Sequence, residues 1–234
     1  MNMASAHFST SARPLIIGHR GASGHAIENS LAAFRIAATP GHVARCDGVE
    51  LDVHVTSDRH FVVHHDPVLS TGEQISQVPL STVRAIRLAD GSPVPTLDEA
   101  LAVLGALEVF VEAKGLPADA DAALLDKLRQ DHPARRHIHA FDHRIIARLR
   151  RIDPEISLGV LSCSYPVDPV AQARQAGAAT LWQLAALIDA PLVAACRAAG
   201  IALIAWTVND RDEAHRLRSL GVDGLCGNWP ERLR

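Results

Sequence analysis

The stretch that decides the fold is residues 48–65, GVELDVHVTSDRHFVVHH. It contains two valine-rich apolar runs, Gly48–Val55 and Phe61–His65, and such runs are typical of β-strands. Only the five residues TSDRH separate the two runs. A connection between parallel strands needs a dozen or more residues, so the two runs are predicted to form an antiparallel hairpin.

The hairpin also predicts how three side chains are arranged. Glu50 and Asp52 are two positions apart on the outgoing arm and therefore point to the same side of the strand, while the residues between and beside them are apolar. The returning arm brings His65 back toward this pair. The stretch therefore predicts that two carboxylates and a histidine converge at one strand end.

The rest of the chain alternates short apolar runs with longer segments of helical spacing. The other strand candidates are Leu15–Gly18, Val109–Ala113, His137–Phe141, Ser157–Leu161, Ala179–Leu184, Ala202–Val208 and Gly221–Cys226. The helix candidates are Ser30–Ala38, Leu97–Leu104, Ala118–Gln130, Arg144–Ile152, Val170–Gly177, Pro191–Gly200 and Arg211–Gly221. Without the return arm of the hairpin, eight parallel strands remain.

Eight strands alternating with helices predict a (β/α)₈ TIM barrel with a short β-hairpin and insertion after the second strand. The usual length of that fold, about 250 residues, is close to the 234 residues of this chain. The competing architecture is an open doubly wound sheet, which would place a GxGxxG turn after the first strand. The sequence His19–Ala22, HRGA, does not match that turn.

The amino-acid composition restricts the class of protein and its possible partners. With 48% hydrophobic and 21% charged residues, the chain can bury a substantial core, and we expect one barrel domain over residues 14–234 after a flexible leader of residues 1–13. The net charge of −3 and the 4% aromatic content argue against a nucleic-acid partner. No apolar run is long enough to span a bilayer, so we expect no stable membrane anchor. The four widely spaced cysteines favour a reduced, cytoplasmic protein.

Polar residues gather where the predicted strands end. His19 and Arg20 follow the first strand, and Glu112 and Lys114 end the strand after the hairpin. In barrels of this kind the working residues lie at these carboxyl ends. Buried charges are costly unless they are paired or ligated, so such a cluster predicts mutual ion pairs or a site for a divalent cation and an anion.

Several motifs, in this order and spacing, resemble the glycerophosphodiester phosphodiesterase family, and the resemblance runs from about Leu15 to Pro230. They are GHRGASGHAIENSLAAF (18–34), GVELDVHVTSDRHFVVHHD (48–66), VPTLDEAL (94–101), VEAK (111–114), AFDH (140–143) and WTVND (206–210). The resemblance implies metal-dependent hydrolysis of glycerophosphodiesters to sn-glycerol 3-phosphate and an alcohol by a pair of histidines acting as general acid and base. The cofactor that it implies is a divalent cation, Ca²⁺ or Mg²⁺, because its ligands would be carboxylates.

The same resemblance implies a role for each matching residue. The catalytic histidines would be His19 and His65, and the metal ligands Glu50, Asp52 and Glu112. Arg20 and Lys114 would bind the phosphate, Trp206 would form an aromatic wall beside the glycerol, and Glu28 would support Arg20 or the metal.

Departures from the family pattern concern the surroundings of the site. Ile27 stands in place of a proline, the stretch Val68–Gly72 is short and lacks an arginine, and Gly227 stands where threonine is common. These differences leave the headgroup preference open.

Some assignments stay open. One alternative function is a phospholipase-type barrel acting on lysophospholipids or phosphatidylinositol, and another is a non-catalytic glycerophosphodiester-binding protein. The family spacing favours His65 over its neighbour His64. His54 is as compatible with a structural hydrogen bond as with the pocket mouth, and Asp142 is as compatible with a helix cap as with a site role. Other histidines, His137 and His139 among them, show no partner pattern and are expected at the surface or at helix ends.

Overall fold

The structure is a computed structural model, and it describes residues 13–130, 132 and 135–234. The predicted leader lies outside the described residues except for Arg13, whose Nη1 lies 2.7 Å from Oδ2 of Asp47. The flexibility of the leader stays a prediction.

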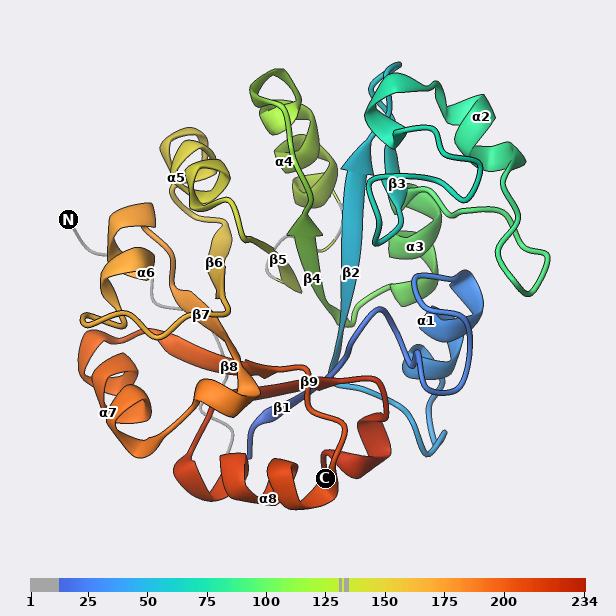
Figure 1. Cartoon of the computed structure of the whole chain (residues 1–234). Coiled ribbons are helices and arrows are strands. Elements are labelled where there is room, and N and C mark those ends of the chain that lie inside the picture. Colours follow the sequence, from blue (N-terminus) through green and yellow to red (C-terminus); the bar gives the residue numbers. More distant parts are fainter. Residues whose placement is uncertain (1–12, 131, 133–134) are drawn as a thin grey trace.

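Eight parallel strands form a closed barrel, as the sequence predicts (Figure 1). The strands are β1 (Leu15–Gly18), β2 (Gly48–Val55), β4 (Glu108–Ala113), β5 (Arg136–Ala140), β6 (Ser157–Ser162), β7 (Thr180–Leu184), β8 (Ala202–Trp206) and β9 (Gly224–Gly227). Each pairs with the next in chain order, and β1 pairs with both β2 and β9 to close the ring. Closure brings the first and last strand ends to one face, where the site lies.

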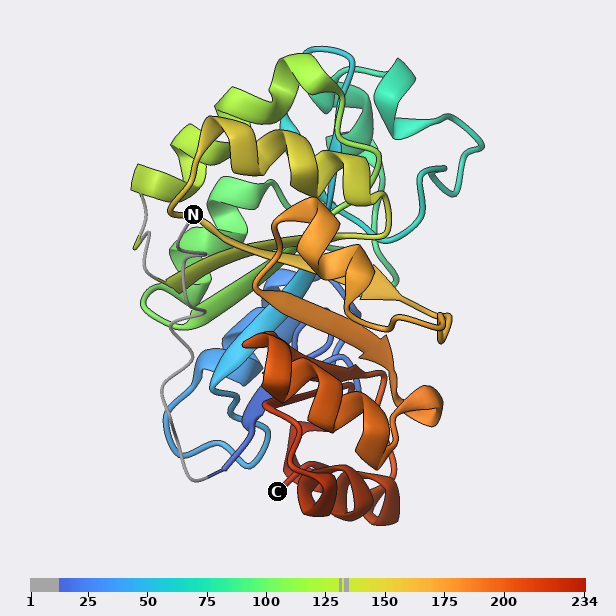
Figure 2. The same ribbon diagram turned by 90° about the vertical axis from the view of Figure 1, so that its left-hand side faces the viewer.

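Helices surround the barrel in both views (Figures 1 and 2). They are α1 (Leu31–Ala38), α3 (Leu97–Leu104), α4 (Asp121–Gln130), α5 (His143–Ile152), α6 (Ala171–Ala176), α7 (Ala190–Ala199) and α8 (Arg211–Leu220). Left-handed glycines Gly177, Gly200 and Gly221 end three of them, which satisfies the last carbonyls without a Cβ clash. Asp142 accepts a hydrogen bond from the Arg144 amide and caps α5, so the helix-cap interpretation of this residue is confirmed. Asp142 also lines a cavity at the mouth of the barrel, and its site role stays a prediction.

The predicted hairpin is confirmed, with a shorter return arm. Strand β3 (Phe61–Val63) pairs antiparallel with β2, Val53 opposite Val63. The amide of His64 still donates to the Asp52 carbonyl at 3.0 Å, but the sequence prediction extended the strand to His65. Pro67 has no N–H for a further ladder bond, and the chain turns away before reaching it.

The segment between β3 and α3 packs around a small core of its own. It contains the one-turn helix η1 (Ile75–Gln77) and the short α2 (Leu80–Ala85). We call this the insertion core; its buried members are Val62, Leu69, Ile75, Val83 and Val94. Figures 1 and 2 show this segment beside the carboxyl end of β2, next to the mouth of the barrel.

Two further apolar layers hold the barrel. The large one lies between strands and helices. The smaller one fills the barrel and takes one residue from each of six strands: Ile17, Phe110, Leu161, Trp182, Ile204 and Cys226. Leu161, Trp182 and Cys226 of this inner layer also line a cavity at the carboxyl ends of the strands.

Two general features complete the fold. In the described part of the chain, no helix has both the length and the apolar character needed to cross a bilayer. The four cysteines are all free; Cys46, Cys196 and Cys226 are buried and Cys163 is exposed.

Candidate active site

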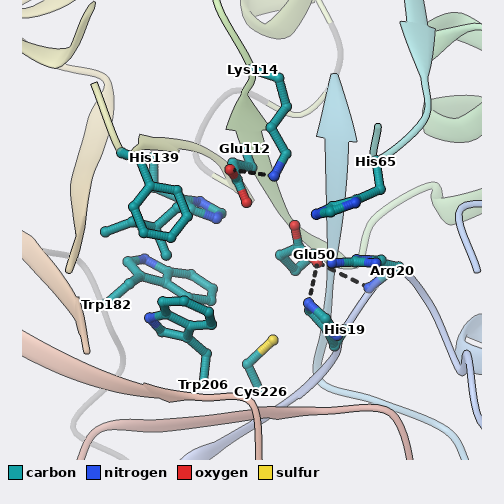
Figure 3. Close-up of a pocket in the computed structure, with 12 residues that line it drawn as sticks. His19, Arg20, Glu50, His65, Glu112, Lys114, His139, Trp182, Trp206 and Cys226 are labelled. Atoms are coloured by element: carbon teal, nitrogen blue, oxygen red, sulfur yellow. Dashed lines mark hydrogen bonds and ion pairs between the residues drawn. The ribbon is translucent and has the colours of Figure 1, made fainter. Parts of the chain in front are cut away.

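A small cavity of about 50 Å³ opens at the carboxyl ends of the barrel strands. Its lining includes His19, Arg20, Glu50, His65, Glu112, Lys114, His139, Trp182 and Trp206. Figure 3 shows His19, Arg20 and His65 on one side and His139, Trp182 and Trp206 on the other, with Glu50 and Glu112 between them. The structure thus gathers most of the residues predicted from the sequence into one pocket.

The two carboxylates of β2 share one side of the strand but have different surroundings. Asp52 is 1% exposed and fully engaged: Nδ2 of Asn29 donates to its Oδ2 at 2.7 Å, and Nε of Arg20 and Nζ of Lys114 each lie 3.2 Å from one of its oxygens. Glu50 accepts a hydrogen bond from the Arg20 amide through Oε2 at 2.9 Å. Its Oε1 is buried and has no hydrogen-bond partner among the described residues.

The pKa values of these carboxylates follow from the same contacts. Burial, together with repulsion from Asp52 and Glu112, raises the pKa of Glu50 well above its usual value. Burial and the Asp52 charge raise the pKa of Glu112 to about 7. Burial also acts to raise the pKa of Asp52, but Lys114 and Arg20 outweigh it and the pKa of Asp52 is lowered. Lys114 and Arg20 therefore stabilise the negative charge of Asp52, whereas the negative charge of Glu50 is not stabilised to the same extent.

This imbalance fits a divalent cation. A buried carboxylate oxygen without a partner is costly, and it lies beside a second buried carboxylate, Glu112. One oxygen from each of Glu50 and Glu112 and one nitrogen of His139 lie within 4.8 Å of one another. The donors on this side of the pocket are therefore of the kinds that bind divalent metals.

The two basic residues are held by acidic neighbours. Nη1 of Arg20 lies 2.8 Å from Oε2 of Glu28, and this glutamate is half-exposed at the rim. Nζ of Lys114 lies 2.7 Å from Oε1 of Glu112. Glu28 therefore contacts Arg20 directly, one of the two supporting positions predicted for it.

The two predicted catalytic histidines are each oriented through Nδ1. Nδ1 of His19 is 2.7 Å from Oδ1 of Asn228, and Nδ1 of His65 is 2.7 Å from Oδ1 of Asp66. In both rings Nε2 is the nitrogen left for the pocket. Burial, reinforced by the positive charge of Arg20, lowers the pKa of His19, so its imidazole is neutral near pH 7.

The neighbouring histidines have distinct places. His64 does not line the cavity; its Nδ1 hydrogen-bonds to the Asp66 carbonyl at 2.8 Å. His54 fulfils both possibilities considered for it, because its Nε2 hydrogen-bonds to the His65 carbonyl at 3.1 Å and its side chain lines an outer cavity. Through that bond His54 supports the backbone that carries His65.

An outer cavity of about 440 Å³ adjoins the inner one. The two share His65, Glu112, Lys114 and Phe141 in their linings. Phe141 packs edge-to-face against Trp206, with ring centroids 5.5 Å apart. The site is thus a narrow charged compartment with a partly aromatic edge that opens into a wider space.

Three polar residues of the site were not assigned functions from the sequence. Asn29 fixes Asp52, and Asn228 fixes His19 from the far end of the chain. The prediction that His137 and His139 lie at the surface or at helix ends is wrong, because both are buried on β5, and His139 pairs in register with Glu112 of β4. The alternation of His137, His139 and Phe141 with apolar residues could have predicted that these side chains share one side of a strand. The strand register that places His139 beside Glu112 is visible only in the assembled barrel.

Comparisons with known proteins agree with this geometry. Residues 19–232 match the model of the Glycerophosphoryl diester phosphodiesterase family. The chain belongs to this family. Every residue predicted for its site lies within the matched range.

Its similarity to individual members extends over nearly the whole chain. It is 29% identical to the glycerophosphodiester phosphodiesterase of Caldanaerobacter subterraneus subsp. tengcongensis, over 94% of this chain and 96% of that protein. Among solved structures, a phosphodiesterase from Oleispira antarctica in complex with the product sn-glycerol-3-phosphate is 27% identical with a TM-score of 0.84, covering 94% and 95% of the two chains. The Thermotoga maritima glycerophosphodiester phosphodiesterase, at 24% identity, shares the fold with a TM-score of 0.78 over 94% and 97%.

Proposed function

We propose that the chain hydrolyses glycerophosphodiesters to sn-glycerol 3-phosphate and an alcohol, with a divalent cation and a pair of histidines. The observation that carries the proposal is the convergence of two Nδ1-anchored histidines, two basic side chains and buried carboxylates in one pocket. The product bound to the Oleispira antarctica phosphodiesterase supports the substrate class.

Glu50, Asp52 and Glu112 are the proposed metal ligands, and Ca²⁺ or Mg²⁺ the proposed ion. The uncompensated Oε1 of Glu50 supports this assignment. When bound, the cation supplies positive charge for the phosphoryl oxygens in the transition state.

Arg20 and Lys114 bind the same phosphoryl group in this proposal. Both side chains line the inner cavity and each is less than one-fifth exposed. In such partly dry surroundings their positive charges stabilise the negative charge that grows on the phosphoryl oxygens. They are already fixed by Asp52 before substrate arrives, so little reorganisation is required.

His19 and His65 move the protons. One accepts the proton of the attacking hydroxyl as its oxygen bonds to phosphorus, and the other protonates the alcohol oxygen as its bond to phosphorus breaks. Each such proton transfer is worth roughly 10²–10⁴-fold in rate. Trp206 forms the wall for the glycerol, and the outer cavity receives the alcohol that leaves.

The test is product analysis by ³¹P NMR on a panel of glycerophosphodiesters with Ca²⁺ or Mg²⁺. The wild-type protein should release sn-glycerol 3-phosphate. The His19→Ala and His65→Ala variants should lose at least about 10²-fold in turnover while keeping the wild-type melting temperature. His64→Ala is the matched control and should retain activity, since His64 lies beside His65 but outside the cavity.

The same spectra separate the alternatives. Full activity in both histidine variants would remove the proposed mechanism. Faster release of product from lysophospholipid micelles than from glycerophosphodiesters would indicate a phospholipase-type barrel, and binding without cleavage would indicate a binding protein. A transient cyclic phosphate would identify the glycerol hydroxyl, and not water, as the attacking group.

The cytoplasmic location predicted from the sequence remains part of the proposal. Its support is that the four cysteines are unpaired, which is usual for proteins kept in a reducing compartment.

A further inference from the structure

His139 is an interior histidine without a structural partner. It is 1% exposed, and its Nδ1 is buried with no hydrogen bond among the described residues. Its ring is stacked on Trp182 with centroids 4.1 Å apart and planes 10° from parallel. Leaving a buried imidazole nitrogen unsatisfied costs free energy, so packing alone does not account for a histidine at this position.

Its neighbour on the same strand, His137, differs in having a carboxylate partner of its own. His137 also points into the barrel, with its Nε2 2.7 Å from Oε2 of Glu108 and its ring stacked on Phe110. Two residues further along β5, His139 reaches the level of the site and pairs in register with Glu112. Figure 3 shows its imidazole beside the Glu112 carboxylate.

A nitrogen of His139 lies close enough to the Glu50 and Glu112 carboxylates for the three residues to bind one metal ion. One of its nitrogens and one oxygen from each of Glu50 and Glu112 lie within 4.8 Å of one another. Two donors that share an ion at about 2.1–2.4 Å can lie no more than about 4.8 Å apart. All three residues are buried, so water competes poorly for the position between them.

We propose that His139 is an additional metal ligand, which adds a nitrogen donor beside Glu50 and Glu112 to the carboxylate set proposed above. An imidazole donor favours transition metals such as Mn²⁺ and Co²⁺ relative to Ca²⁺, which takes oxygen ligands. The chain is therefore selective for a Mn²⁺-class ion over Ca²⁺. This inference rests on the metal dependence in the proposed function, but it replaces Ca²⁺ or Mg²⁺ as the preferred ion with one that accepts a nitrogen ligand.

The test measures metal binding directly. Metal-stripped wild-type, His139→Gln and His137→Gln proteins are titrated with Mn²⁺, Co²⁺ and Ca²⁺ by isothermal calorimetry. Losing even an outer partner of a metal ligand weakens binding about 10–100-fold, so His139→Gln should weaken Mn²⁺ and Co²⁺ binding by at least about tenfold. Ca²⁺ binding should change less, and the His137→Gln control should bind all three ions as the wild type does.

A spectroscopic measurement on protein that retains His139 tests for a nitrogen ligand directly. Electron spin echo modulation from ¹⁴N should be present in the Mn²⁺-loaded wild type. It should persist in the His19→Ala/His65→Ala double variant, which retains His139 but removes the other two pocket histidines. Its loss in that double variant would overturn the assignment.

The outcomes separate this inference from the proposed function. If the wild type binds no divalent ion, the metal dependence in the proposed function fails and this inference fails with it. If His139→Gln binds Mn²⁺ as tightly as the wild type, His139 is not a ligand while metal dependence stands. His139→Asp, which replaces the nitrogen donor with oxygen, should shift the preference toward Ca²⁺.

Discussion

Single hydrogen bonds at the rim orient the rings of the two histidines proposed to be catalytic. Asn228 holds Nδ1 of His19 at 2.7 Å, and its own backbone amide donates to Oδ1 of Asn209 at 2.9 Å. Residues 209 and 228 lie just after β8 and β9. Two neighbouring strand ends thus fix the ring of His19, although the histidine itself follows β1.

We expect Asn228→Ala to lower kcat about tenfold or more, because His19 loses the bond that sets its orientation and a misdirected acid–base group loses rate. KM and the melting temperature should change little. The pH profile of kcat distinguishes positioning from a purely structural effect. Asn228→Asp, which keeps an acceptor and adds a negative charge, should recover part of kcat and shift the limb controlled by His19 to higher pH. Unchanged kcat in Asn228→Ala would contradict this role.

At the residue scale, motifs alone predicted most of the polar side chains that line the inner cavity, because HRG, ExD and VEAK each carry them at short spacing. They did not identify the groups that orient those side chains. Asn228 is 209 positions from His19, and His139 reaches Glu112 only through strand register. Gly227, noted as a departure from the family pattern, has a backbone reason: a Cβ there would overlap the carbonyl oxygen of Val208.

At the scale of elements, the start of α3 ties the insertion to the barrel. Thr96 and Glu99 form a capping box, in which Oγ1 of Thr96 accepts from the Glu99 amide and the Glu99 carboxylate accepts from the Thr96 amide. Arg84 of α2 also binds the Glu99 carboxylate, with Nη1 2.6 Å from Oε2. Burial opposes ionisation of Glu99, but the bonds from Thr96 and Arg84 outweigh it and lower its pKa.

Because the folded-state pKa of Glu99 is lowered, its stabilising effect is present above about pH 4.5, the usual glutamate range. It is lost as the pH falls through the lowered value. Glu99→Gln should reduce the free energy of unfolding by about 1 kcal/mol at pH 7, a figure discounted for the exposure of the ion pair. Chemical denaturation at pH 7 and near pH 3 measures this, and the difference should shrink at the lower pH. Asp98→Asn, in the same helical turn but outside the box, is the control and should show a smaller effect. A difference independent of pH would exclude the linkage.

Element types were predictable because strand and helix periodicity differ, and the five-residue gap forced the hairpin. Element ends were less predictable. Strand β3 ends at Val63, two residues before the predicted end, because the chain turns toward Pro67 after His64 makes its last ladder bond. The packing of the insertion core likewise depends on contacts that local patterns do not specify.

At the scale of the whole molecule, the site gathers three carboxyl groups in the barrel, and the pKa values of two of them, Glu50 and Glu112, are raised. Repulsion among Glu50, Asp52 and Glu112 opposes folding in the metal-free protein. An ion that binds only the folded state stabilises it by about 2.7 kcal/mol at 100 times Kd.

We therefore expect a bound divalent ion to raise the melting temperature by roughly 5–10 °C, since 1 kcal/mol shifts a domain of this size by about 2–4 °C. EDTA should remove both the shift and the activity. Differential scanning fluorimetry with and without the ion measures the shift, and Glu50→Gln should abolish it. Activity that persists in EDTA would count against the metal.

The insertion core has a consequence for how this protein can diversify. Its buried residues form a cluster separate from those of the barrel, and Pro67 and Ser76 from this segment line only the outer cavity. In the proposed function the outer cavity receives the leaving alcohol, and substitutions in this segment would reshape it without repacking the layers that hold Glu50, Glu112 and His19. Residues 67–93, which leave Asp66 in place beside His65, thus form an exchangeable segment: descendants or engineered chimaeras can acquire new headgroups by replacing it, while the proposed reaction is retained.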